Sequence, residues 1–170
     1  NFEKKYKKLL LKCLSNNALT NNRTHTKTYK LFNESININL NEGFPILTSK
    51  KIFFEKALAE FKWMFKGRTD LKYLQDNNIK WWNDFANDNK ELGKVYGHQI
   101  RNLGLPYDII VGALFLTTIS NKCNLKADTL GINLADAHIY ENHLNQVKEY
   151  CNNKIHNLPK LEGNYNNYAL

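Results

Sequence analysis

The sequence has few of the residues that build disulfide-linked or metal-bound proteins. Its 170 residues include only three cysteines, three prolines and one methionine. The cysteines are Cys13, Cys123 and Cys151, and no two of them form a Cys-x-x-Cys pair. A zinc site or a thioredoxin-type motif therefore has no support, and we predict no metal. Three widely spaced thiols indicate free cysteines in a reducing compartment.

Long apolar runs and a secretory leader are also missing. No segment approaches the ~20 apolar residues of a membrane span. Residues 1–5 carry charge and lead into an amphipathic stretch, whereas a secretory leader would continue with an apolar one. We therefore expect a soluble, cytoplasmic protein without membrane contact. Met64 is the single methionine and the sequence opens on Asn1, so we expect residues to be missing before it.

A surplus of cations accompanies a composition suited to one folded domain over residues 1–170. Lys and Arg number 24 against 16 Asp and Glu, a formal charge of +8, and 42% of the residues are hydrophobic. Positive charge suits a nucleotide phosphate or an acidic cofactor tail, but lysines scattered among many asparagines favour an AT-rich gene as the explanation of the bulk charge. Because we find no nucleic-acid-binding motif, we expect no nucleic-acid partner.

Helical spacing dominates the hydrophobic pattern, whereas strands are scarce. We predict helices over 2–13, 52–65, 71–75, 81–87, 109–119 and 139–151, and strands within 36–40 and 121–134. These strands are too few to bury so many apolar helix faces, so an α/β domain would need more sheet than the sequence supplies.

Seven short segments form an ordered set along the chain. They are 22–28 (NRTHTKT), 43–51 (GFPILTSKK), 60–67 (EFKWMFKG), 73–82 (YLQDNNIKWW), 92–99 (LGKVYGHQ), 103–108 (LGLPYD) and 136–143 (DAHIYENH). Each resembles a motif of the thymidylate synthase family, and the seven occur in the order of that family. One match alone would be weak, but seven in order make coincidence very hard to accept.

The resemblance implies an α/β (α+β) fold, in which a mixed β-sheet packs against helices and two chains dimerise through the sheet. It also implies a methyltransferase that moves a one-carbon unit from 5,10-methylenetetrahydrofolate to C5 of a pyrimidine nucleotide monophosphate. The implied reaction is that of thymidylate synthase, on deoxyuridylate, or of its deoxycytidylate hydroxymethylase variant. The expected partners are the nucleotide, the folate and a second copy of the chain. Such chemistry needs a thiolate, cations for the phosphate and a proton relay.

The resemblance gives catalytic roles to three side chains. Glu60 would organise a water and proton relay near the base, because a carboxylate on an apolar helix face is costly without a role; the alternative is an exposed helix residue. Tyr96 would assist proton transfer near the reacting carbon. Asp108 stands where deoxyuridylate enzymes have asparagine and phage deoxycytidylate hydroxymethylases have aspartate.

Asp108 leaves two readings open. A carboxylate accepts a hydrogen bond from the 4-amino group of cytosine and repels O4 of uracil, whereas an amide can donate to O4. Asp108 therefore hints at a cytosine nucleotide. Aspartate is also a good helix N-cap, which is an equally good explanation of the residue.

Further residues of the resemblance would bind the nucleotide and the folate. Arg23 would bind the phosphate through its planar fork of donors. His138 and Tyr140 would bond to the ribose hydroxyl, since positions i and i+2 share one face of a strand or turn. The implied folate site consists of Trp81, Trp82, Phe85, Leu103, Gly104, Tyr107, Lys50 and Lys51. Within it Trp82 would stack on the cofactor, and the two lysines could attract its glutamate tail, or be ordinary surface lysines.

One stretch of the family has no counterpart in this sequence. Between Asn102 and Leu103 we find neither the paired arginines, nor the Pro-Cys-His nucleophile, nor the Gln-Arg-Ser-x-Asp segment. A second jump falls near Leu161. The three cysteines that are present look structural, so the nucleophilic cysteine is absent from the sequence. We expect that the sequence joins parts of a longer chain; a true deletion would instead leave a non-catalytic relative that binds a nucleotide or a protein partner.

Overall fold

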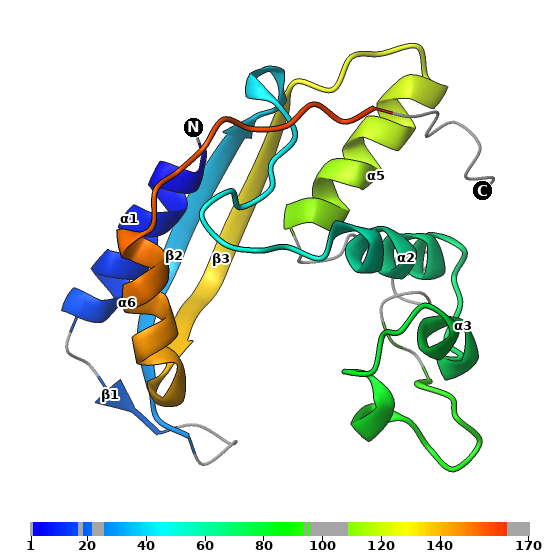
Figure 1. Ribbon diagram of the computed structural model, residues 1–170, viewed down its shortest axis with the longest axis horizontal. Helices are drawn as coiled ribbons and strands as arrows, with labels where there is room; N and C mark the ends of the chain where they lie inside the picture. The colour runs from blue at the N-terminus through cyan, green and yellow to red at the C-terminus, as the bar shows by residue number, and fades with distance from the viewer. Residues whose placement is uncertain (1, 17–18, 22–25, 94, 96–108, 163–170) are drawn as a thin grey trace. The chain divides into compact units, whose positions relative to one another are not determined.

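The computed structural model describes residues 2–16, 19–21, 26–93, 95 and 109–162 (Figure 1). The chain divides into two compact units, one of Asn1–Ile52 with Asp128–Leu161 and the other of Phe53–Ala127 with Glu162–Leu170. The predicted mixture of helices and sheet is confirmed. Several predicted site residues lie outside the described ranges, namely Arg23, Tyr96, Leu103, Gly104, Tyr107 and Asp108.

The unit that begins at Phe53 is helical in its described part. It contains α2 (Phe54–Phe65), α3 (Leu71–Asp76), the short 3-10 turn η2 (Asn83–Phe85) and α5 (Ile109–Lys122). Aromatic rings join α2 to α5: the ring of Phe115 lies 5.5 Å from Phe61 and 4.9 Å from Phe65, measured between centroids. The helices predicted over 52–65, 71–75 and 109–119 are therefore confirmed.

Two predicted helices differ from the structure. Residues 81–87 form only the turn η2, because the side chain of Asn87 accepts hydrogen bonds from the backbone N–H of Asn89 and of Glu91 and so favours a turn. The helix predicted over 139–151 begins at Leu144, because residues 139 and 140 still pair with a neighbouring strand.

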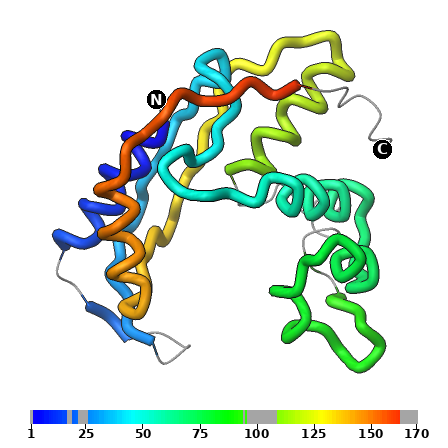
Figure 2. Tube along the Cα trace, in the orientation of Figure 1, coloured from blue at the N-terminus to red at the C-terminus, as the bar shows by residue number. Residues whose placement is uncertain are grey.

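The other unit is built on an antiparallel sheet with the strand order β1-β2-β3. Its strands are β1 (Leu19–Thr20), β2 (Thr28–Asn39) and β3 (Thr129–Tyr140). The helices α1 (Phe2–Ser15) and α6 (Leu144–Asn152) lie beside each other along this sheet (Figure 1). Figure 2 shows the chain beyond α6 running back along the unit, and there the N–H of Phe44 donates to the carbonyl of Pro159 at 2.7 Å.

The core of this unit lies between the sheet and the helices. Cys13 of α1, Leu31 of β2 and Ile139 of β3 are buried together. The thiol of Cys13 donates to the carbonyl of Tyr29 at 2.9 Å, and burial raises the pKa of this thiol. Cys13 is thus a structural residue, as its place on the apolar face of the first helix predicts.

Asn33 shifts the alternation of side chains along β2 by one residue. It has a positive φ of 56°, and the pairing of β2 with β3 passes over it. Before Asn33, the side chain of Leu31 packs in the core beside Cys13 of α1. After Asn33, it is Glu34 that faces α1, and its carboxylate pairs with Lys12. Alternation then puts Phe32, which is 66% exposed, on the face turned away from α1.

A buried carboxylate connects three distant segments of the same unit. Glu3 on α1 is 0% exposed. It accepts hydrogen bonds from the hydroxyls of Thr48 and Ser49, both at 2.6 Å, and from their backbone N–H groups at 2.9 and 3.1 Å. The hydroxyl of Tyr150 on α6 donates to it at 2.8 Å. Five donors around one carboxylate satisfy the hydrogen-bonding capacity that burial takes from water.

These donors reverse the usual effect of burial on an acid. Burial by itself raises the pKa of Glu3, but the hydroxyls of Ser49 and Thr48 and their backbone N–H groups outweigh it and lower the pKa from 4.5 to about 2. Burial, with the adjacent Glu3 carboxylate second, raises the pKa of Tyr150 far above its usual range. The network therefore holds an anion on Glu3 and a neutral phenol on Tyr150.

The substitution Glu3→Gln tests this network. Since the folded-state pKa is depressed, the contribution of Glu3 to stability is fully present above pH 4.5 and is lost as the pH falls toward 2. A shift of this size corresponds to roughly 3 kcal/mol. We expect the difference in unfolding free energy between the wild type and the variant to be near that value at neutral pH and to shrink between pH 4.5 and 2. Urea unfolding followed by far-UV circular dichroism measures it.

The exposed Glu149 on α6 offers the matched control. Glu149→Gln removes one carboxylate from the same unit without disturbing a buried network, so we expect little change in stability at any pH. Equal pH dependence of stability in the wild type and in Glu3→Gln would contradict the account.

Candidate functional site

The predicted ribose-binding pair lies near the end of β3. His138 and Tyr140 are two positions apart on this strand, and their ring centroids are 5.2 Å apart with the planes at 86°. Tyr140 also meets His143 edge-on at 5.9 Å. The intervening Ile139 points into the core, so His138 and Tyr140 face the opposite side of the sheet. The prediction that they share one face is confirmed, and their role in ribose binding stays a prediction.

Two charged side chains that sequence reasoning did not select lie next to His138. Asp136 Oδ1 is 3.4 Å from His138 Nδ1, and Asp136 Oδ2 is 3.8 Å from Lys30 Nζ. Lys30 stands directly opposite His138 in the pairing of β2 with β3. A signal for Asp136 was available, because it precedes His138 by two positions within the motif 136–143.

The predicted catalytic carboxylate contacts the predicted folate wall. Glu60 is half-buried on α2, and its Oε1 accepts hydrogen bonds from the indole N–H of Trp82 at 2.6 Å and of Trp81 at 3.4 Å. A donor aimed at a carboxylate holds it in one position. The structure thus brings together Glu60, Trp81 and Trp82, three residues chosen from sequence.

A buried tryptophan packs against Trp82 of this predicted folate site. Trp63 is 0% exposed, and its ring lies 6.1 Å from that of Trp82. Its indole N–H donates to the carbonyl of Asp70 at 2.9 Å. Trp63 is therefore part of the core packing, and its fixed ring gives Trp82 a rigid base.

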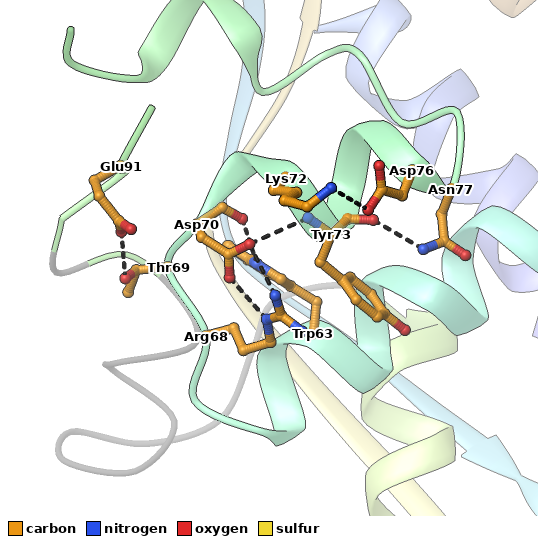
Figure 3. Close-up of polar contacts among 9 residues, drawn as sticks. All are labelled: Trp63, Arg68, Thr69, Asp70, Lys72, Tyr73, Asp76, Asn77 and Glu91. Carbon is orange, nitrogen blue, oxygen red and sulfur yellow. Dashed lines mark hydrogen bonds and ion pairs between the residues drawn. The ribbon is translucent and has the colours of Figure 1, made fainter. Parts of the chain in front are cut away.

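Asp70 carries several of the contacts that fix this region (Figure 3). Its carboxylate caps α3 by accepting from the N–H of Tyr73 at 3.1 Å and binds Arg68 through two hydrogen bonds of 2.7 and 2.9 Å. The Arg68 hydrogen bond is the main reason that the pKa of Asp70 is lowered. The guanidinium of Arg68 also lies 4.7 Å from the ring centre of Tyr73. Trp63 therefore donates to a residue that is held twice, as the N-cap of α3 and by its ion pair with Arg68.

Exposed aromatic rings accompany the two tryptophans that donate to Glu60, and the ring of Phe85 lies 6.0 Å from that of Trp82. Phe85 is 72% exposed, Trp81 50% and Phe53 60%. Lys56, one turn before Glu60 on α2, lies 5.8 Å from the ring centre of Trp81 and 5.5 Å from that of Phe53. Sequence reasoning missed Phe53 and Lys56, although the spacing of Lys56 from Glu60 could have indicated the latter. Large exposed rings are available for stacking against a flat ligand.

Lys50 and Lys51 lie in the other unit, directly after the two residues that bind Glu3. Both are exposed and line an open pocket of about 510 Å³. The remaining lining residues are Thr48, Ser49, Asn153, Lys154 and His156. Three lysines around one pocket create a positive potential that suits carboxylates or phosphates.

Neither a metal centre nor an activated thiol accompanies these groups in the described part of the chain. No cluster of three or more His, Cys, Asp or Glu side chains there could hold a metal ion. Cys123 is exposed at the end of α5, and burial raises the pKa of Cys151 as it does that of Cys13. A raised pKa disfavours the thiolate that a nucleophile needs. Among the described helices, none has the length and apolar character to cross a membrane.

The pair Trp82→Phe and Trp81→Phe tests how Glu60 is held. Trp82→Phe keeps an aromatic ring but removes the donor at 2.6 Å, so we expect a loss of roughly 1–2 kcal/mol of unfolding free energy. Trp81→Phe removes only the longer contact of a half-exposed side chain, and we expect at most about 0.5 kcal/mol. Urea unfolding by circular dichroism measures both. Equal losses in the two variants would contradict a specific Trp82–Glu60 bond.

Comparison with protein-family models gives a match to thymidylate synthase over residues 4–103 and 101–169. The two matches meet at residues 101–103, where the motif order predicts that the segment with the nucleophilic cysteine is missing. Together they span nearly the whole sequence, including all seven motifs. The chain therefore belongs to the thymidylate synthase family.

Proposed function

We propose that this protein, with its cysteine-bearing segment, transfers a one-carbon unit from 5,10-methylenetetrahydrofolate to C5 of a pyrimidine nucleotide monophosphate. Family membership supports one-carbon transfer to a pyrimidine nucleotide and a place among the methyltransferases of nucleotide biosynthesis. The observation that carries the proposal for this chain is the Glu60 carboxylate, which the indole of Trp82 holds at 2.6 Å beside exposed aromatic rings. A fixed carboxylate next to an apolar stacking surface is what a proton relay beside a pyrimidine requires.

Each named side chain has a defined task in this proposal. Glu60 orders water and moves protons near the base, while the rings of Trp82 and Phe85 stack on the pterin and exclude bulk water. His138 and Tyr140 hold the ribose hydroxyl. Methylenetetrahydrofolate supplies the one-carbon unit and the hydride. In this proposal the attacking thiolate comes from a residue outside this sequence, since burial raises the pKa of Cys13 and Cys151 and Cys123 lies outside the seven motifs.

The chemistry of residues in each unit supports the folate as the one-carbon donor. Its flat ring system suits the exposed rings of Trp81 and Phe85. Its glutamate carboxylates suit the pocket that Lys50 and Lys51 line, and Lys154 adds a third cation there. We propose these lysines as the site of the glutamate tail.

The proposal also includes a homodimer formed through the sheet. Its support is Phe32 of β2, which is 66% exposed on the sheet face turned away from α1 and pairs with Asp136, so the second chain would border the proposed sugar site on that face. A large apolar ring on an otherwise polar strand face is typical of a surface that another chain covers.

Asp108 determines the base in our proposal, and its replacement tests the choice between uracil and cytosine. In the full-length enzyme, Asp108→Asn gains an N–H donor for uracil O4, so we expect the ratio of activity on deoxyuridylate to that on deoxycytidylate to rise at least roughly tenfold. Tritium release from the labelled nucleotides measures it. Asp70→Asn, at the N-cap of α3, is the matched control and should leave the ratio unchanged. An unchanged ratio in Asp108→Asn would mean that Asp108 is only a helix cap.

The thiols favour a second candidate, a non-catalytic relative that binds a nucleotide or a protein partner. In the sequence as it stands, Cys13 is buried, Cys151 has a raised pKa, and Cys123 lies outside the motifs that resemble the family. The intact mass of the natural protein separates the two candidates. The enzyme proposal predicts a mass well above 19.9 kDa, whereas a natural protein of 19.9 kDa would overturn it in favour of the binding protein.

A further inference from the structure

The side chains on one face of β3 form a continuous polar row. Asp136, His138 and Tyr140 follow one another at every second residue and therefore project to the same side. The contacts run along the row: 3.4 Å from Asp136 Oδ1 to His138 Nδ1, and 5.2 Å from the ring centre of His138 to that of Tyr140. The imidazole is thus bounded by a carboxylate at Nδ1 and by a ring that meets it edge-on.

Lys30 on the neighbouring strand holds the carboxylate at the head of this row. Its ammonium lies 3.8 Å from Asp136 Oδ2, the oxygen that does not face His138. The side chain of Lys30 is only 22% exposed and is fixed in the strand pairing opposite His138, so its ammonium group has few other positions. One oxygen of Asp136 therefore serves Lys30, while the other serves His138.

The position of the carboxylate decides which nitrogen of a neutral imidazole carries the proton. A lone pair on Nδ1 would lie 3.4 Å from a negative oxygen and be repelled, whereas an N–H there is attracted. The Nδ1–H tautomer is therefore favoured, and Nε2, at the far side of the ring, is left with its lone pair as a hydrogen-bond acceptor.

We propose that Asp136, anchored by Lys30, is a positioning residue that fixes His138 as the Nδ1–H tautomer, so that Nε2 accepts a hydrogen bond from the sugar hydroxyl of a nucleotide. The identity of the ligand rests on the proposed function. Asp136 touches no ligand in this arrangement and acts only through His138. The acceptor at His138 Nε2 makes the site selective for a sugar with a free hydroxyl. In a deoxynucleoside 5′-monophosphate this is the 3′ hydroxyl.

The tautomer itself is measurable without any ligand. The ¹⁵N chemical shifts of the His138 ring, at a pH where the ring is neutral, should report a protonated Nδ1 in the wild type. Asp136→Ala should return the ring toward the Nε2–H form that a free imidazole favours in water. Asp136→Asn keeps a carbonyl acceptor and should restore part of the Nδ1–H population. An Nε2–H ring in the wild type, or a ring that is unchanged in Asp136→Ala, overturns the proposal.

Lys30→Met and Glu34→Gln complete this experiment. Lys30→Met removes the ammonium but keeps the aliphatic stem, so we expect a smaller loss of the Nδ1–H form than in Asp136→Ala. Glu34→Gln removes a carboxylate that faces α1 on the other side of the sheet and should leave His138 unchanged. Because Asp136 is 42% exposed, we expect these variants to fold, and circular dichroism of each checks it.

Binding then tests the consequence for the ligand. We expect the wild-type chain to bind a pyrimidine deoxynucleoside monophosphate more tightly than its 2′,3′-dideoxy analogue, and Asp136→Ala to reduce this ratio of affinities by roughly 2- to 10-fold. An undiminished ratio in Asp136→Ala overturns the proposed role. A wild-type chain that binds neither nucleotide contradicts the proposed function alone, and the tautomer measurement still decides the role of Asp136.

Discussion

The buried carboxylate of Glu3 is the contact on which the architecture of the sheet-containing unit depends. It joins α1 to the chain at residues 48 and 49 and, through Tyr150, to α6. Without its five donors a charge at this depth would cost several kcal/mol, and without the charge the donors would lose their shared acceptor. The same network fixes the backbone directly before Lys50, so the pocket with its lysines inherits its shape from an interaction in the core.

The Glu60 carboxylate of the helical unit differs from Glu3 in its exposure. Glu60 remains half-buried beside exposed rings, and the indole groups of Trp81 and Trp82 donate to its carboxylate. Trp63, pinned by Asp70, gives this wall its rigidity. A carboxylate that is held but still reachable can exchange protons, whereas the enclosed Glu3 cannot do so without loss of stability. Burial therefore separates a structural acid from a candidate catalytic one.

Sequence patterns predicted the helices well where apolar spacing was long and regular, as in α2 and α5. They failed where local hydrogen bonds or tertiary pairing decided the outcome. Asn87 turned a predicted helix into a short turn, and the pairing of Ile139 and Tyr140 with β2 extended a strand into another predicted helix. The buried Glu3 was not foreseen either, because its five donors come from segments more than forty residues away.

The candidate site shows the same division. Motif order was enough to select Glu60, Trp82, His138 and Tyr140, and the structure adds how Trp82 contacts Glu60 and how Asp136 and Lys30 flank His138. Lys30 could not be selected from its own surroundings, because only the register of β2 against β3 brings it opposite His138. Candidate residues can thus be selected from sequence, whereas the groups that contact them follow from the fold.

The central claim is that the exposed face of β3 receives the sugar of a pyrimidine nucleotide. A crystal structure of the full-length protein with a bound pyrimidine deoxynucleoside monophosphate tests it most directly. The account predicts that the sugar hydroxyl lies within about 3 Å of His138 Nε2 and of the Tyr140 hydroxyl. A nucleotide bound elsewhere, with its sugar away from both side chains, would contradict it.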